Sequence, residues 1–151
     1  RSLRPSESHL NFNEQRLLSY WIPAEKLRPG HPATRYAVEL ASQLLRPLVP
    51  LSQEELVGVE WWPRLQPAVA GRLMHNDRDQ STERHEGVVP AYSSILYMTD
   101  VGGPTTIVNQ SMGSDGVEKP ELPDRGVFSY PKRGLFTLFR GDLMHSVMPP
   151  L

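Results

Sequence analysis

The spacing of hydrophobic positions changes along the chain near residue 57. Before that point, apolar residues between 31 and 50 recur at the three- and four-residue spacing of a helix that buries one face; they are Ala37, Leu40, Ala41, Leu44, Leu45 and Leu48. Pro32 fits the first turn of this helix, where its missing N–H costs nothing. Shorter helical turns are predicted over residues 16–21 and from Ser52. The pattern therefore predicts a helical support over residues 1–56.

From residue 57 onwards, short runs of β-branched and aromatic residues alternate with Gly and Pro, a pattern typical of strands and turns. The predicted strands cover residues 57–62, 70–75, 91–98, 105–108, 127–130, 134–139 and 143–147. Two polar stretches, 77–90 and 109–126, are expected to be long loops that are either mobile lids or disordered. The fold class predicted from this order is mainly β, an all-β barrel or sandwich over residues 57–151 with N-terminal supporting helices in one domain.

Length and composition narrow the class of protein further. The 151 residues fit a single domain, and the 16 basic and 17 acidic side chains nearly cancel. This balance removes the electrostatic reason to expect a nucleic acid or an anionic membrane as partner. No apolar run reaches the ~18 residues of a membrane span, and the first residues lack the apolar core of a signal peptide. We expect a soluble protein, with its compartment and oligomeric state left open.

The absence of cysteine restricts the chemistry available to the chain. It excludes a disulfide framework, a thiolate nucleophile and any Cys-based zinc or iron–sulfur site. A metal ion must therefore be held by His, Asp, Glu or backbone oxygen.

His75 and Asp77 stand two residues apart at the end of a predicted strand. Side chains two apart on a strand point to the same face, so both can aim at one point inside a barrel mouth. His145, near the end of the strand series, can supply a third ligand. Two imidazoles and one carboxylate on one face of a metal suit a non-haem Fe(II) oxygenase. The alternative is a polar strand end beside a solvated loop, with His145 as a hydrogen-bonded structural histidine.

Three segments around these residues carry short motifs that occur in the same order as the motifs of a known family. They are residues 71–79 with His75-Asn76-Asp77, residues 92–105 with Gly102-Gly103 and Thr105, and residues 134–147 with Gly141-Asp142 and His145. Together they resemble the Fe(II)/2-oxoglutarate-dependent oxygenase superfamily, in its prolyl-4-hydroxylase-like branch. That family shows His-x-Asp, a strand followed by Gly-Gly and Thr, then a strand, a Gly-Asp turn and the distal His. The resemblance covers about residues 57–151.

The resemblance implies a double-stranded β-helix, a jelly-roll or cupin-like barrel of two facing sheets. It implies that His75, Asp77 and His145 bind Fe(II) at the open end and that Thr105 contacts the co-substrate 2-oxoglutarate. With O₂, the family forms succinate and usually hydroxylates a second substrate, with ascorbate able to serve as reductant. Prolyl, other peptidyl and small-molecule substrates share this frame, so the substrate stays open.

One expected part of the family pattern is missing. The family places a Lys or Arg shortly after the distal His, where it pairs with the far carboxylate of 2-oxoglutarate. No basic residue stands in the six residues that follow His145. Three explanations stay open: the natural chain continues beyond Leu151, the basic anchor lies elsewhere in the chain, or co-substrate binding is impaired. Four other basic side chains could pair with this carboxylate, but we expect them on the solvated surface; they are Arg72, Arg84, Arg133 and Arg140.

Two other functions compete with the oxygenase. The first is a non-catalytic interaction module, in which the same barrel keeps a metal without turnover. The second is a metal-dependent hydrolase that uses the same His and Asp residues with zinc. His85 and Glu86 are expected to belong to a solvated loop, and Asp142 to serve the turn after Gly141.

Overall fold

A computed structural model describes residues 20–23, 57–61, 64, 71–77, 89–113 and 116–150. Its elements within these ranges are all β-strands, which confirms the mainly β class. None of these ranges contains a helix that could cross a membrane. The chain divides into two compact units, residues 1–65 and 66–151. The predicted helix between residues 31 and 50, the turn from Ser52 and the loop residues 78–88 lie outside the described residues.

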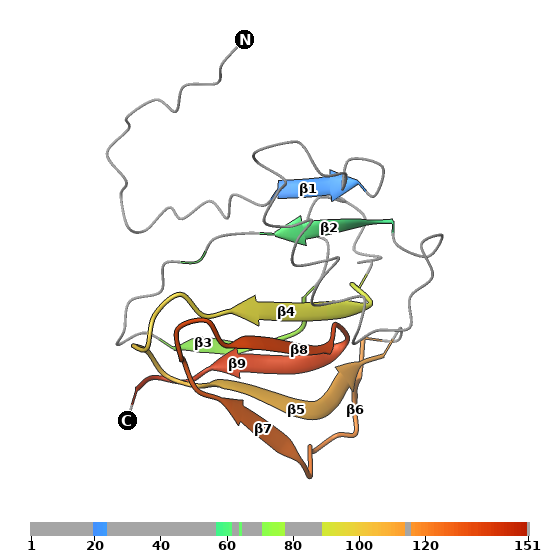
Figure 1. Cartoon of the computed structure of the whole chain (residues 1–151). Helices are drawn as coiled ribbons and strands as arrows, with labels where there is room; N and C mark the ends of the chain where they lie inside the picture. Colours follow the sequence, from blue (N-terminus) through green and yellow to red (C-terminus); the bar gives the residue numbers. More distant parts are fainter. Residues whose placement is uncertain are drawn as a thin grey trace, which may run out of the picture. The chain divides into compact units, whose positions relative to one another are not determined.

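The first unit contains a pair of antiparallel strands, β1 (Tyr20–Pro23) and β2 (Gly58–Trp61), drawn in blue and green in Figure 1. The strand predicted from residue 57 is confirmed, but the helical turn predicted through Tyr20 and Trp21 is wrong. Aromatic and β-branched residues favour a strand when a partner is present, and Ile22 is buried opposite Val59. That partner lies 37 residues away along the chain, so local spacing did not reveal it.

The second unit contains the strands that position the candidate site. They are β3 (Arg72–His75), β4 (Tyr92–Leu96), β5 (Thr105–Met112), β6 (Glu118–Lys119), β7 (Gly126–Ser129), β8 (Phe136–Arg140) and β9 (Leu143–Val147). Each predicted strand between residues 70 and 147 overlaps one of them, whereas β6 lies in a stretch that the sequence predicts to be a loop. The expected loop from residue 109 is wrong at its start, because β5 continues to Met112 and pairs there with β6.

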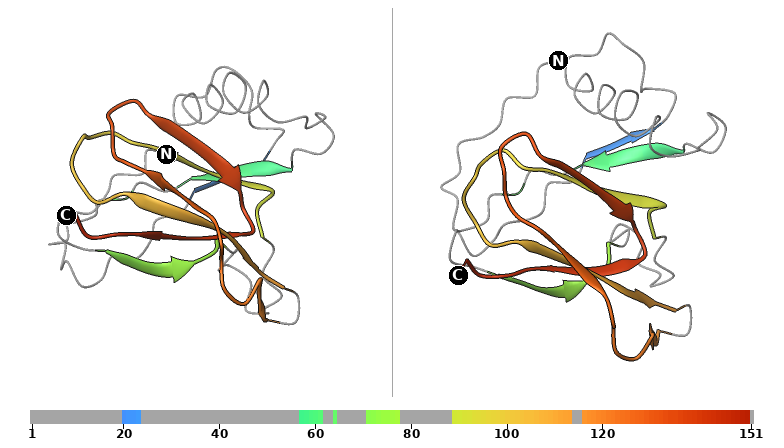
Figure 2. Two further views of the ribbon diagram at one scale, coloured as in Figure 1. Left: turned by 90° about the horizontal axis from the view of Figure 1, so that it is seen from below. Right: turned by 60° about the horizontal axis from the view of Figure 1, so that its bottom comes forward.

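The strands of the second unit pair as three nested antiparallel pairs. β3 pairs with β9, β4 with β8, and β5 with β7. β9 also pairs with β5, so one sheet has the order β3-β9-β5 with β6 and β7 along the other edge of β5. Figure 1 and Figure 2 show this larger sheet curled into a half-barrel, with the separate β4–β8 pair lying across from it.

Side chains from both sheets meet on the inner face of the half-barrel. Phe139 of β8 packs its ring against His145 of β9, with ring centroids 5.0 Å apart. Ile107 of β5 is buried on the same face, because it is the register partner of His145. The inner face therefore carries apolar side chains beside polar ones.

The segment between β6 and β7 is tied to β5 by two amide side chains. Gln110 Nε2 donates to the carbonyl oxygens of Pro120 and Glu121, at 2.9 and 3.0 Å. Asn109 Oδ1 accepts hydrogen bonds from the backbone N–H groups of Asp124 and Arg125, at 3.2 and 3.1 Å. The described part of the expected lid is thus a loop held against the sheet.

Gly103 marks the closest approach between the start of β5 and the end of β9. Met148 N donates to Pro104 O at 2.9 Å, and a Cβ at Gly103 would overlap the carbonyl oxygen of Met148. We expect Gly103→Ala to lower the free energy of unfolding by at least about 1–3 kcal/mol, because backbone must move to admit the methyl group. The midpoint of urea unfolding measures the change.

Gly126→Ala is the matched control, since a Cβ there would lie 3.3 Å from its nearest neighbours, Ile107 O and Val108 Cγ1. We expect its stability to stay within about 1 kcal/mol of the wild type. Equal losses in both variants would contradict the close approach at Gly103.

Candidate metal centre

The pairing of β3 with β9 brings the two predicted histidine ligands together. His75 and His145 are register partners, so their side chains share one face of the sheet. Their ring centroids lie 4.3 Å apart with the planes tilted by 51°. Asp77 follows two residues after His75, and one ligand atom from each of the three side chains lies within 4.8 Å of the others. The convergence predicted from the sequence is present in the fold.

Both imidazoles are oriented by the same backbone hydrogen bond. His75 Nδ1 lies 2.8 Å from Leu73 O, and His145 Nδ1 lies 3.0 Å from Leu143 O. A carbonyl oxygen only accepts, so each Nδ1 carries the proton. In the neutral rings, this leaves the Nε2 lone pairs available, which is the arrangement found in metal-ligating histidines.

The carboxylate of Asp77 divides its two oxygens between different neighbours. Oδ2 accepts a hydrogen bond of 2.6 Å from Ser93 Oγ on β4. Oδ1 lies 3.7 Å from His145 Nε2, beyond the ~2.7–3.2 Å of an N–H···O hydrogen bond. Ser93 was not among the predicted site residues. Ser93 lies opposite Phe139 of β8, which places its side chain on the inner face, but no local pattern in the sequence relates it to Asp77.

Burial favours the neutral form of His75. Loss of solvent is the main cause that lowers the pKa of His75, and the charges of Arg72 and His145 lower it further. The hydrogen bond with Leu73 and the charge of Asp77 act in the opposite direction. A lowered pKa keeps the ring in the form that can bind a cation.

The donor set fits a first-row divalent metal ion. Two imidazole nitrogens and one carboxylate oxygen are ligands that such ions accept, and they leave further coordination positions open. The side chains of Asp77 and His145 are only 16% and 8% exposed. Among the described residues, the ion-pair partner of Asp77 is His145, which is charged only when protonated. A cation between them would supply the positive charge that this carboxylate lacks.

Binding would draw the three side chains closer together. Ligand atoms typically lie ~2.0–2.2 Å from a metal such as zinc, so two ligand atoms of one ion are at most about 4.4 Å apart. The three ligand atoms of the triad are up to 4.8 Å apart. His145 is held in place by Phe139 and Ile107, whereas His75 is half-buried on the edge strand β3. We therefore expect His75 to make the larger adjustment.

Thr105 lies in a group of four hydroxyl side chains on the same inner face. It is 3% exposed and accepts a hydrogen bond of 2.8 Å from Tyr97, whose hydroxyl also lies 3.0 Å from Ser129 O. Ser129 Oγ lies 2.7 Å from Thr137 Oγ1. We call Tyr97, Thr105, Ser129 and Thr137 the hydroxyl cluster. The contact of Thr105 with a co-substrate stays a prediction.

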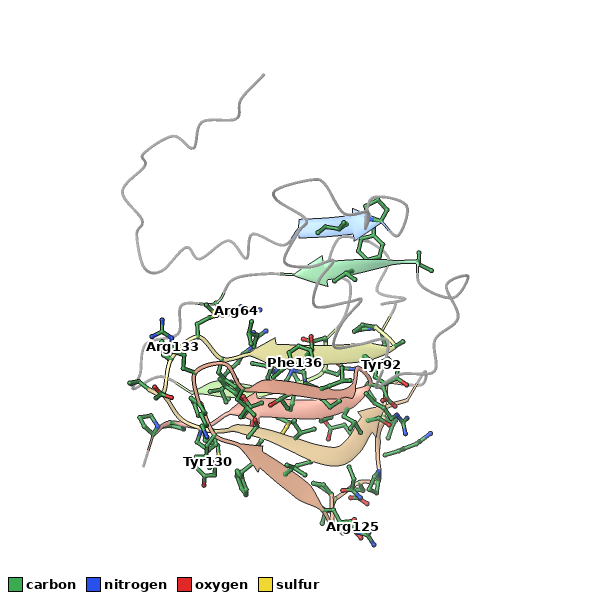
Figure 3. All side chains as sticks on the ribbon, in the orientation of Figure 1. Arg64, Tyr92, Arg125, Tyr130, Arg133 and Phe136 are labelled. Carbon is green, nitrogen blue, oxygen red and sulfur yellow. The ribbon has the colours of Figure 1, made fainter. Side chains whose placement is uncertain are left out.

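The basic residues differ in how they relate to the centre. Arg133 and Arg140 are exposed, as expected, and Figure 3 places Arg133 at the periphery of the second unit. Arg140 pairs with Asp142 through both oxygens, so this carboxylate stabilises the turn between β8 and β9. Arg72 differs from the expectation of a solvated residue, since it is half-buried on β3 and its charge acts on His75.

Three other candidates lie outside the described residues; they are Arg84, His85 and Glu86.

The chain was compared with known proteins at three levels. It matches no protein-family model, no curated protein and no solved structure.

The triad predicts that three single substitutions each weaken the binding of a divalent cation. His75→Ala, Asp77→Ala and His145→Ala each remove one ligand atom. We expect Co²⁺ affinity to fall by more than the ~10–100-fold typical of substitutions outside the ligand set. Isothermal titration calorimetry measures the loss.

Asp142→Ala is the control, because this carboxylate pairs with Arg140 rather than with the triad. Its Co²⁺ affinity should equal that of the wild type. Tight binding retained by both His75→Ala and Asp77→Ala would contradict the ligand assignment.

Proposed function

We propose that the chain is an Fe(II)- and 2-oxoglutarate-dependent oxygenase whose second unit folds as a double-stranded β-helix. The nested pairs β3·β9, β4·β8 and β5·β7 support this fold, because they describe one long antiparallel ribbon. The additional β5·β9 pairing joins successive turns of that ribbon into the larger curled sheet. A wound ribbon of this kind encloses a space between two sheets, which is where the triad lies.

The observation that carries the proposal is the convergence of His75, Asp77 and His145 on the inner face. Two histidines and one carboxylate form the ligand set of non-haem Fe(II) oxygenases, and the open coordination positions can accept co-substrates. Iron with 2-oxoglutarate and O₂ supplies the oxidative chemistry when bound. The resemblance of residues 71–79, 92–105 and 134–147 to that family supports the same assignment.

In this proposal, the protein orients the ligands and limits the access of water. The Nδ1 bonds of His75 and His145 present both Nε2 atoms to one point. Phe139 and Ile107 cover His145 on its buried side. A dry, shaped wall beside the metal protects a reactive centre from side reactions with water.

The hydroxyl cluster and Arg72 are the described groups suited to bind the carboxylates of 2-oxoglutarate. Hydroxyl groups can donate to a carboxylate, and Thr105 shares the inner face with Ile107, the register partner of His145. Arg72 is the register partner of Val147, which in turn pairs with Thr105. A guanidinium on this side of the sheet can pair with a carboxylate in a charge-assisted hydrogen bond.

A metal-binding interaction module without turnover is the second candidate. One observation favours it: in the described part of the chain, the hydroxyl groups of the hydroxyl cluster are already hydrogen-bonded to one another and to a backbone carbonyl. A barrel that holds a metal but cannot anchor 2-oxoglutarate would keep the triad and lack the reaction.

The oxygenase proposal predicts that the full-length protein converts 2-oxoglutarate to succinate in the presence of Fe(II) and ascorbate. Without a second substrate, we expect the same conversion at a low, uncoupled rate. Succinate detected by mass spectrometry measures the reaction. Asp77→Ala should abolish succinate formation, because it removes the carboxylate ligand. If the wild type binds Fe(II) and forms no succinate under any condition, the interaction module becomes the better account.

The role of Arg72 predicts a selective effect on the co-substrate. We expect Arg72→Ala to raise the KM for 2-oxoglutarate by about 10-fold or more, the loss typical of a hydrogen bond between charged groups. Arg133→Ala, which removes an exposed arginine at the periphery, is the matched control and should leave the KM unchanged. An unchanged KM in Arg72→Ala would place the anchor elsewhere.

A further inference from the structure

Ser93 connects the candidate metal centre to the second sheet. It lies on β4, whereas the triad comes from β3, the residues just after it, and β9. Its side chain is buried, and its hydroxyl donates a hydrogen bond of 2.6 Å to Asp77 Oδ2. This length is typical of an O–H donor bonded to an ionised carboxylate.

The bond selects which oxygen of Asp77 faces the triad. The final torsion of an aspartate side chain is broad and roughly two-fold, so an isolated carboxylate can present either oxygen in many orientations. With Oδ2 held by Ser93, Oδ1 is the oxygen that lies towards His145 Nε2, at 3.7 Å. Carboxylates that bind metals are usually oriented by such partners.

We propose that Ser93 is a positioning residue that holds Asp77 ready to bind the metal through Oδ1 alone. The proposal rests on the proposed metal centre and adds to it a residue outside the ligand set. Because Ser93 belongs to β4, the same bond ties a ligand on one sheet to the other sheet. Metal binding should therefore stabilise the pairing of the two sheets through Asp77.

The neighbouring residue provides a matched control. Ser94 follows Ser93 on β4 and is exposed, because alternate side chains of a strand point to opposite faces. Ser94→Ala thus removes the same hydroxyl from the same strand without touching the triad. Ser93→Val and Ser93→Thr have nearly the same volume and differ in the hydroxyl group, and neither adds a metal-binding thiol.

The test is a Co²⁺ titration without co-substrate, followed by absorption spectroscopy, on the wild type and four variants. We expect Ser93→Ala and Ser93→Val to bind Co²⁺ about 10–100-fold more weakly. Ser93→Thr, which keeps the hydroxyl, should restore most of the affinity, and Ser94→Ala should match the wild type. The rise in unfolding temperature on adding Co²⁺ should shrink in the same order.

The outcomes separate this proposal from the one on which it rests. If the wild type binds no Co²⁺, the metal centre itself is wrong. If the wild type binds and Ser93→Ala and Ser93→Val bind equally well, the metal centre stands and the role of Ser93 is overturned. Equal weakening in Ser93→Thr and Ser93→Val would also overturn it, because the hydroxyl would then not be the group that matters.

Discussion

The position of β9 between β3 and β5 is the constraint on which the candidate site depends. His145 lies opposite His75 on one side and opposite Ile107 on the other. A slip of one residue in either pairing would turn the side chain of His145 to the other face of the sheet. The register therefore decides both whether the two imidazoles meet and whether an apolar wall stands behind them.

The inner face of this half-barrel is more polar than an ordinary protein core. Burial of a polar group costs free energy unless it is hydrogen-bonded, and here nearly every such group has a defined partner. Leu73 O and Leu143 O hold the histidines, Ser93 holds Asp77, and the hydroxyl cluster is bonded within itself. The carboxylate of Asp77 is largely buried, and its ion-pair partner among the described residues is a histidine that is charged only when protonated, which is why a cation is the addition that the chemistry favours.

The sequence predicted those features that depend on local spacing. The strand over residues 143–147 matches β9 in both bounds, and the alternation of side chains placed His75 and Asp77 on one face. Features that depend on distant partners were missed or mistaken. Tyr20 and Trp21 form a strand only because β2 pairs with them, and Ser93 gains its role from an aspartate 16 residues earlier. Neither relation leaves a periodic signal in the chain.

The length of β5 shows the same limit. Asn109 and Gln110 are polar and were assigned to a loop, yet their side chains bind the segment before β7 while their backbone continues the strand. Strand propensity depends on context, so a strand is hard to predict where its polar side chains bind partners elsewhere in the chain.

The central claim is that one divalent ion binds at Nε2 of His75, Oδ1 of Asp77 and Nε2 of His145. The most direct measurement is a crystal structure of the protein grown with Co²⁺, with the ion located by its anomalous scattering. Our account predicts one strong site bonded to these three atoms on the inner face of the half-barrel. An ion found only at other residues, with the triad left as separate side chains, would contradict it.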